Sequence, residues 1–342
     1  MAYSIEQILG AHSAPARYLQ WLAEKAEDRT AEQDADAPFL SVLMRTQGKR
    51  YEMLKEALLS LEAQTDQDFE VILVVHKPTE EDFEATVALL DALTPTFGKK
   101  VRHFRLDTGT RSSPLNLALS HAKGRYIAML DDDDLVLENW VEVFHECARK
   151  NDGSVIRCYG LTQFWSCYTN ERGQTVLQSD EAPVPTYCTP FRMHEHLEDN
   201  HTPISCVAIP RACYSVFGIG FDEALSTAED WDFLMQCASL CGVTDTREIT
   251  FLYRLWKNAE TSHTVHREKE WLQNRDYIAD KLSRLPYITA GKGKWPVTED
   301  GEENEIVLKP SFKDRLKNAI RTHGLWRLPF LVLRKIFFRL FR

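Results

Sequence analysis

The sequence lacks any run of 18 consecutive apolar residues in its 342 positions. A helix needs about 20 such residues to cross a bilayer, so we expect no membrane-spanning segment. The first residues also lack the basic start and the apolar core of a signal peptide. We therefore expect the protein to reside in the cytoplasm.

Cysteine pairs of the CxxC type are also missing, although eight cysteines lie between positions 147 and 241. Structural zinc sites usually rely on such closely spaced pairs, so we do not expect one here. Cysteines of a cytoplasmic protein stay reduced. The sequence therefore predicts free, partly buried thiols.

The sequence has no net positive charge either, because 41 lysines and arginines against 51 acidic residues give a formal charge of −10. This charge argues against a general nucleic-acid binder. The distribution is uneven, because residues 313–342 hold nine basic residues and one acidic residue. Bulky apolar side chains alternate with these cations, which suits the surface of an anionic membrane, such as the inner face of the plasma membrane. A helix packed on the main domain or on a partner subunit would show the same pattern.

Apolar patterns predict alternating strands and helices in the first half of the chain. Strands are expected at 39–44, 69–75, 101–106 and 124–130, with helices at 54–63, 80–97 and 114–122 between them. This alternation is typical of an α/β fold with a mostly parallel central sheet flanked by helices.

The later part of the chain predicts a helix at 135–150, strands at 155–165, 174–177, 206–210 and 250–254, and a helix that starts at Asp230. We divide the chain into a helical extension with a linker (1–37), the main domain (38–265), a helical and loop extension (266–312) and the basic tail (313–342).

Four consecutive aspartates, residues 131–134, follow the predicted strand at 124–130. Neighbouring carboxylates repel one another, and packing does not require them at the end of a strand. They are explained by a cation or by a ring of hydroxyl groups at this place. Mg²⁺ and Mn²⁺ bind hard oxygen ligands and often use one or two carboxylates plus substrate phosphates. The alternative is a solvated acidic turn before the next helix.

A second acidic cluster contains Glu229, Asp230 and Asp232. One carboxylate of such a cluster can accept a proton from an attacking hydroxyl group, if its pKa suits cytosolic pH. Helix capping by Asp230 is the alternative. The carboxyl ends of parallel strands share one edge of a sheet, where ligands gather. We expect Thr46, Arg111 and the aspartates to meet there.

Residues 39–265 resemble the family 2 glycosyltransferases of the GT-A fold. The resemblance rests on the order of several motifs. They are Ser41-Val42-Leu43-Met44-Arg45-Thr46, the helix that leads to Phe69-Glu70-Val71-Ile72, Asn116, the stretch 124–135, and Glu229-Asp230-Trp231-Asp232.

The resemblance implies a nucleotide-sugar donor, Mn²⁺ or Mg²⁺, and transfer of a sugar to a glycan or lipid-linked acceptor, most often with inversion. It implies that Asp131 and Asp132 reach the ribose and the edge of the metal, and that Asp133 holds the metal on the diphosphate. Asp230 matches the expected general base, and Thr46 matches the loop that touches the nucleoside. His263 is a candidate metal ligand, although a loop histidine near His266 is often merely exposed.

The sequence departs from the family pattern in two places. Val75-His76-Lys77-Pro78 replaces an acidic turn that contacts the base, which leaves the nucleotide open. Pro114-Leu115-Asn116 replaces an Ala-Arg-Asn sequence, so Arg111 is the candidate for the missing phosphate-facing cation.

Acceptor pockets of the family lie in its variable region, here about 160–225. The aromatic residues of this region can stack on sugar rings or pack in the core; they are Phe164, Trp165, Tyr168, Tyr187 and Phe191.

Two other functional classes remain as alternatives. A nucleotidyltransferase would also bind a nucleotide and a metal, but it usually has a glycine-rich loop after the first strand, and this loop has only Gly48. A catalytically inactive GT-A domain that binds nucleotide or glycan as a scaffold would not need both acidic clusters. We therefore expect an active, hexosyltransferase-type enzyme.

Overall fold

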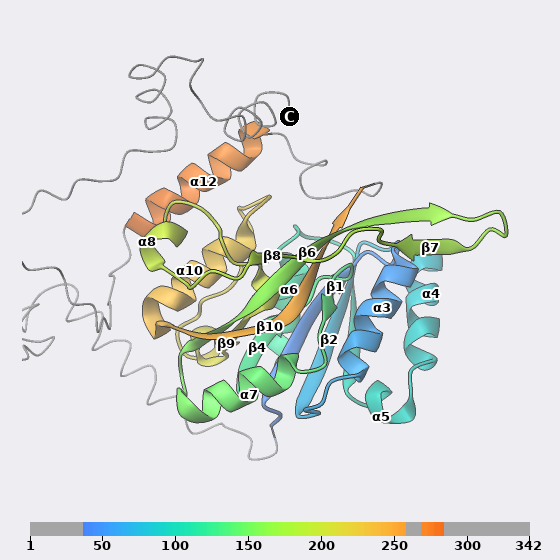
Figure 1. Ribbon diagram of the computed structural model, residues 1–342, viewed down its shortest axis with the longest axis horizontal. Coiled ribbons are helices and arrows are strands. Elements are labelled where there is room, and N and C mark those ends of the chain that lie inside the picture. The colour runs from blue at the N-terminus through green and yellow to red at the C-terminus, as the bar shows by residue number, and fades with distance from the viewer. Residues whose placement is uncertain (1–36, 258–267, 284–342) are drawn as a thin grey trace, which may run out of the picture. The chain divides into compact units, whose positions relative to one another are not determined.

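A ten-stranded sheet forms the centre of the computed structural model, which describes residues 37–257 and 268–283 (Figure 1). The strand order is β3-β2-β1-β4-β9-β6-β10-β5, and β7 and β8 pair with β6. The bounds are β1 (Leu40–Thr46), β2 (Phe69–His76), β3 (Val101–Leu106), β4 (Tyr126–Met129), β5 (Leu135–Val136), β6 (Val155–Thr169), β7 (Thr175–Gln178), β8 (Val184–Tyr187), β9 (Val207–Pro210) and β10 (Val243–Trp256).

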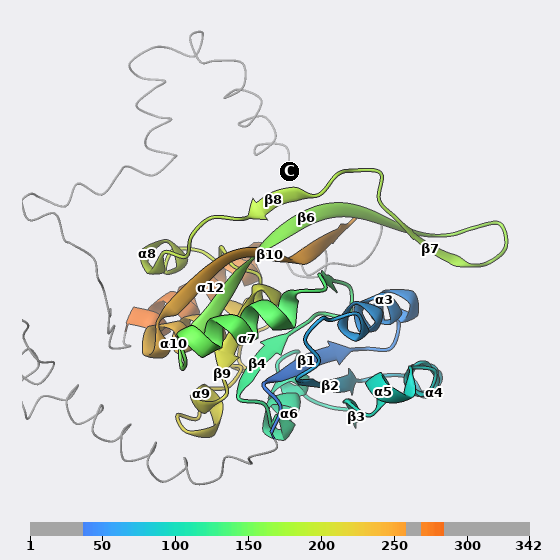
Figure 2. The ribbon, with the colours of Figure 1, turned by 60° about the horizontal axis from the view of Figure 1, so that its bottom comes forward.

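Helices cover both faces of this sheet (Figure 2). Their bounds are α3 (Tyr51–Glu62), α4 (Glu80–Asp91), α5 (Pro95–Gly98), α6 (Ser113–His121), α7 (Trp140–Lys150), α8 (Met193–His196), α9 (Ala212–Ser215), α10 (Glu229–Cys241) and α12 (Glu268–Ser283), with a 3₁₀ turn at Ile204–Cys206. One core contains residues of α3 and α7, and the other contains residues of α6 and α10.

β1 shows why the sheet is covered on both sides. Val42 and Met44 enter the core beneath α3 and α7, whereas Leu43 enters the core beneath α6 and α10. All three side chains are fully buried. A continuous apolar strand is typical of a parallel sheet with helices on both faces.

The predicted α/β fold is confirmed, and parallel pairing holds from β3 through β2 and β1 to β4. The second half is mixed, because β9 runs antiparallel to both β4 and β6 while β10 runs parallel to β6. The predicted helix at 135–150 is wrong for its first residues. Leu135 and Val136 pair with β10 as a short strand, and the helix begins at Trp140.

A third, smaller core joins α12 to α10. Ile278 and Leu282 of α12 pack with Leu225, Trp231 and Met235. This helix is the described part of the predicted extension 266–312. Residues 1–36 and the tail 313–342 lie outside the described residues. No helix in the described ranges is long and apolar enough to cross a membrane.

Candidate functional site

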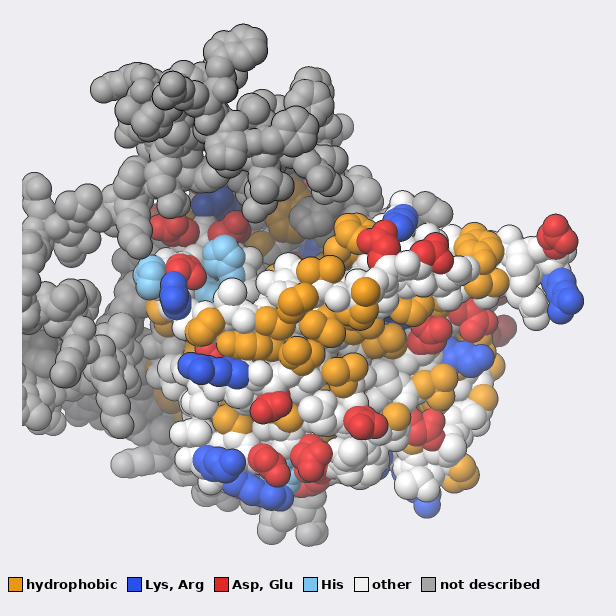
Figure 3. All heavy atoms as spheres, viewed as in Figure 1, with side chains coloured by type: hydrophobic (Ala, Val, Ile, Leu, Met, Phe, Trp, Pro, Cys, Tyr) orange, Lys and Arg blue, Asp and Glu red, His pale blue; other side chains and the backbone are white. Residues whose placement is uncertain are grey.

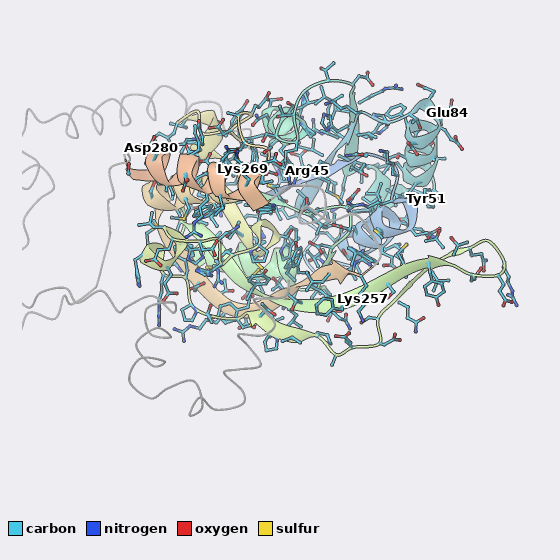
Figure 4. All side chains as sticks on the ribbon, turned by 90° about the horizontal axis from the view of Figure 1, so that it is seen from above. Arg45, Tyr51, Glu84, Lys257, Lys269 and Asp280 are labelled. Atoms are coloured by element: carbon cyan, nitrogen blue, oxygen red, sulfur yellow. The ribbon has the colours of Figure 1, made fainter. Side chains whose placement is uncertain are left out.

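The carboxyl end of β1 and the turn after β4 lie next to each other. β1 pairs with β4 in parallel, with Leu43 opposite Met129. Two residues beyond each of these positions the chain reaches Arg45 and the aspartates 131–134, which we call the acid turn. Figure 4 looks onto this edge of the sheet, with Arg45 at its centre and α12 running from Lys269 to Asp280.

Thr46 contacts the acid turn directly. Its hydroxyl group donates a hydrogen bond of 2.6 Å to Oδ2 of Asp132, which is 9% exposed. Arg50 approaches from the same loop, with Nη1 at 3.5 Å from Asp132 Oδ1 and at 2.5 Å from Asp133 Oδ2. The structure therefore brings together two predicted site residues, Thr46 and Asp132, and adds Arg50, which the sequence did not single out.

The acid turn carries negative charge that Arg50 does not fully offset. Burial, followed by the charge of Asp132, raises the pKa of Asp133 to about 7. Burial also raises the pKa of Asp132, although Arg50 and Thr46 oppose this shift. A bound cation would favour the ionised forms of both groups.

The donor atoms of the acid turn fit Mg²⁺ or Mn²⁺, because they are all carboxylate oxygens. No group of three histidine, cysteine or acidic side chains in the described part of the chain is arranged to hold a metal ion alone. A cation here would need oxygens from a phosphate and from water as well, which is common for Mg²⁺. The predicted ligand His263 lies outside the described residues.

Glu229, the first residue of α10, is paired with two arginines. Oε1 of this buried carboxylate accepts hydrogen bonds from Nη1 of Arg45 at 2.7 Å and from Nε of Arg111 at 2.8 Å. Burial works in the opposite direction, but the two guanidinium groups hold the pKa of Glu229 below its ordinary value. Arg45 also lies 3.6 Å from Asp131.

Arg111 faces Glu229 in this structure, and its Nη1 donates to the carbonyl oxygen of Ser226 at 3.2 Å. Two side chains of the other departure from the family pattern, Val75-His76-Lys77-Pro78, are also hydrogen-bonded. Nζ of Lys77 donates to the carbonyl oxygen of Gly109 at 2.6 Å, and Nε2 of His76 lies 3.1 Å from the carbonyl oxygen of Thr108. Burial lowers the pKa of His76, so this imidazole is neutral near pH 7.

Asp230 follows Glu229 in the first turn of α10 and is partly exposed. Burial, followed by the charge of Glu229, raises its pKa to about 6, and Arg111 opposes the shift. The N-cap residue of α10 is Ala228, and it forms no side-chain cap bond. Asp230 is therefore not the cap, and its pKa suits proton transfer near neutral pH.

Arg254 of β10 stabilises the acid turn through hydrogen bonds, a role that the sequence analysis missed. Its Nε donates to the carbonyl oxygen of Asp133 at 2.5 Å, and its backbone N–H donates to Asp134 Oδ1 at 2.8 Å. The guanidinium carbon lies 5.3 Å from the ring centroid of Trp165 and 4.9 Å from that of Trp256, so it contacts both rings. The sequence signal was an arginine inside an apolar strand, which needs polar partners when it is buried.

The predicted acceptor-side aromatic residues lie in different surroundings. Phe164 and Tyr168 of β6 are exposed, and hydrophobic side chains gather on the face that shows β6 and β8 (Figure 3). Phe191 packs against the small core of α10 and α12. Tyr187 is half-buried and forms an edge-on pair with Tyr253, with ring centroids 6.3 Å apart.

The family model described as glycosyl transferase family 2 matches residues 41–213. An uncharacterized glycosyltransferase of Methanocaldococcus jannaschii is 26% identical over 207 residues, which cover 60% of this chain and 66% of that protein. Glycosyltransferase GlyG of Streptococcus pneumoniae is 31% identical over 104 residues, which cover 30% of this chain and 33% of that protein. The chain thus spans just under two thirds of the first relative and a third of the second.

Among solved structures, S. aureus TarS 1–349 in complex with UDP-GlcNAc superimposes with a TM-score of 0.52 at 16% sequence identity. The match covers 71% of each chain. At this level of identity the similarity concerns the fold, and it confirms the predicted fold class.

Proposed function

Because the chain belongs to glycosyl transferase family 2, we propose that it moves a sugar from a nucleoside diphosphate donor to a hydroxyl group of a glycan or lipid-linked acceptor. One observation carries the proposal. The guanidinium of Arg45 lies 3.6 Å from Asp131 and 2.7 Å from Glu229, so a single side chain joins the acid turn to the start of α10. A donor bound at the acid turn and an acceptor activated at the start of α10 would meet near Arg45.

Asp230 is the proposed general base, since its pKa is raised to about 6 and a base works best with a pKa near the operating pH. The carboxylate accepts the proton of the acceptor hydroxyl group. The hydroxyl oxygen forms a bond to the anomeric carbon, and the bond from that carbon to the diphosphate oxygen breaks. The nucleoside diphosphate leaves with the electron pair, and the configuration at the anomeric carbon is inverted.

Asp133 is the proposed ligand of Mn²⁺ or Mg²⁺, with Asp131 beside it and His263 as a further candidate. The cation would neutralise charge that develops on the leaving diphosphate. Thr46 and Asp132, which are joined by a hydrogen bond, are proposed to face the nucleoside. Arg111 is proposed to act on the donor side only if it releases Glu229, because the two side chains are paired at 2.8 Å.

A donor screen tests the function. UDP-sugars come first, because UDP-GlcNAc is bound in the TarS structure, followed by other nucleotide sugars, each with and without Mn²⁺. We expect one donor to raise the melting temperature and to release nucleoside diphosphate slowly in the absence of acceptor. Asp91→Asn, a change at an exposed acid that ends α4, is the matched control and should behave as wild type. Donor binding without any turnover would instead support the scaffold function, and no binding of any donor would contradict the proposal.

A further inference from the structure

The residue before the Glu229-Asp230 pair has an unusual backbone conformation. Ala228 lies in the left-handed region, with φ 60° and ψ 21°. Residues other than glycine adopt this region rarely, because the Cβ atom crowds the backbone. Such a conformation persists only where the surrounding structure fixes it, and functional sites are where these residues cluster. The contacts on either side of Ala228 are therefore informative.

Asn274 of α12 holds the two residues that precede Ala228. Its side-chain amide nitrogen lies 2.8 Å from Thr227 Oγ1 and 3.0 Å from Ser226 Oγ, and the carbonyl oxygen of Thr227 lies 3.4 Å away. Thr227 is fully buried. Arg111 donates a second hydrogen bond to Ser226, from its Nη1 to the carbonyl oxygen at 3.2 Å. Residues 226 and 227 are thus hydrogen-bonded both to α12 and to the loop before α6.

Two further residues of α12 hold the ends of the same segment. Asp222 Oδ2 accepts hydrogen bonds from the hydroxyl group of Tyr277 at 3.0 Å and from Nζ of Lys281 at 2.9 Å. Lys281 also donates to Oδ2 of Asp232 at 2.8 Å, so it links the loop to the first turn of α10. Spacings of three and four residues place Asn274, Tyr277 and Lys281 along one face of the helix.

The apolar side chains of α12 also pack against the segment that surrounds Ala228. Ile278 and Leu282 pack in a small core with Leu225 before the turn and with Trp231 and Met235 after it. This core is separate from the two that cover the sheet. These polar and apolar contacts of α12 therefore all reach residues 222–235, which contain Asp230. The helix lies beyond residues 41–213, where the family model matches.

We propose that α12 is a brace that sets the direction of the Asp230 carboxylate, and that Asn274 is a positioning residue that holds the left-handed turn at Ala228. The proposal rests on the proposed function of Asp230. Asn274 does not touch the reacting atoms; it acts through Thr227 and Ala228.

A double-mutant cycle in the full chain tests this role. Asn274→Ala should lower kcat for donor turnover by about 10- to 100-fold, the scale of a small misplacement of a reacting group, and leave the donor KM within about twofold. Ala228→Gly alone should keep kcat near wild type, because glycine adopts the left-handed conformation readily. In the double variant kcat should recover most of the loss, since the turn no longer needs Asn274. Gln273→Ala, at an exposed amide on the same helix, is the matched control.

Two results would overturn the proposal: an unchanged kcat in Asn274→Ala, or a loss that Ala228→Gly does not reduce. A second measurement separates this proposal from the proposed function. If wild type turns over no nucleotide sugar, the function fails, and hydrogen exchange of the amides of residues 226–232 still reports on α12. Faster exchange in Asn274→Ala than in Gln273→Ala supports the brace, and equal exchange refutes it.

Discussion

Arg45 and Glu229 are 184 residues apart in the sequence, and their side chains meet at 2.7 Å between Nη1 and Oε1. Arg45 lies one residue before the end of β1 in the parallel half of the sheet, whereas Glu229 begins α10 after the mixed half. Arg111 reaches the same carboxylate oxygen at 2.8 Å. The contact places the second acidic cluster beside the first, which is the arrangement that the proposed function requires.

Glu229→Gln should destabilise the fold at neutral pH by about 2 kcal/mol, the range of a hydrogen bond to a charged group. The pKa of Glu229 is lowered from 4.5 in the folded protein, so its ionised form contributes stability above that pH. The contribution is lost as pH falls through the folded pKa. Urea unfolding at several pH values should therefore show a difference from wild type that shrinks below pH 4.5.

The control for this prediction is Glu195→Gln, the same change in an exposed ion pair with Arg192. Solvent and salt screen such a pair, so its loss should leave the urea midpoint unchanged. A Glu229→Gln variant as stable as wild type at pH 7 would show that the buried contact does not hold the two halves together.

Asp133→Ala should abolish donor turnover while the melting temperature without donor stays at or above that of wild type. The reason is that the substitution removes the proposed metal ligand and also relieves repulsion with Asp132, which contributes to the raised pKa of Asp133. A chelator should have the same effect on wild type, and added Mn²⁺ should restore activity only in wild type. Full activity of wild type in a chelator would refute the metal assignment.

The acid turn and Thr46 illustrate how much of the site the sequence could predict. One predicted strand is followed by aspartates and another by Thr46. If the sheet is parallel, the ends of both strands lie at the same edge of the sheet. The structure confirms this neighbourhood, because Thr46 donates a hydrogen bond to Asp132. The parallel half could be predicted because β1, β2 and β4 are largely apolar and helices separate the successive strands, although β3 alternates apolar and polar residues. The roles of these residues in catalysis stay predictions.

Other parts of the site could not be predicted from local patterns. The partners of Glu229 are arginines that lie far away in the sequence, and the choice between Arg45, Arg111 and solvent depends on the folded arrangement. The strand at Leu135 exists only because β10 is available as a neighbour. The brace formed by α12 depends in the same way on contacts with residues 222–235.

Deletion of residues 313–342, which lie outside the described residues, should abolish binding to anionic liposomes. Nine cations among bulky apolar side chains should hold the full chain on such vesicles at low salt. High salt should release it, because ions screen the attraction. Sedimentation with vesicles at both salt concentrations measures this. Equal binding of both proteins would remove the membrane hypothesis, and aggregation of the truncated chain would favour packing of the tail on protein.

The pH dependence of donor turnover should follow Asp230. The base must be ionised to accept a proton, and its pKa is raised to about 6. The value of kcat/KM reports groups of the free enzyme, so it should rise with pH and level off above about 6. A profile that is flat between pH 5 and pH 8, or one that falls over this range, would assign the proton transfer to another group.

The most direct test of the account is Asp230→Asn, with donor binding and sugar transfer measured separately. The amide keeps the size of the side chain but cannot accept the proton of the acceptor hydroxyl group. Calorimetric binding of the nucleotide sugar should match wild type, while transfer to acceptor should fall by about 10²–10⁴-fold, the usual contribution of a general base. Near-normal transfer by Asp230→Asn would contradict the account, because the start of α10 would then have no catalytic role.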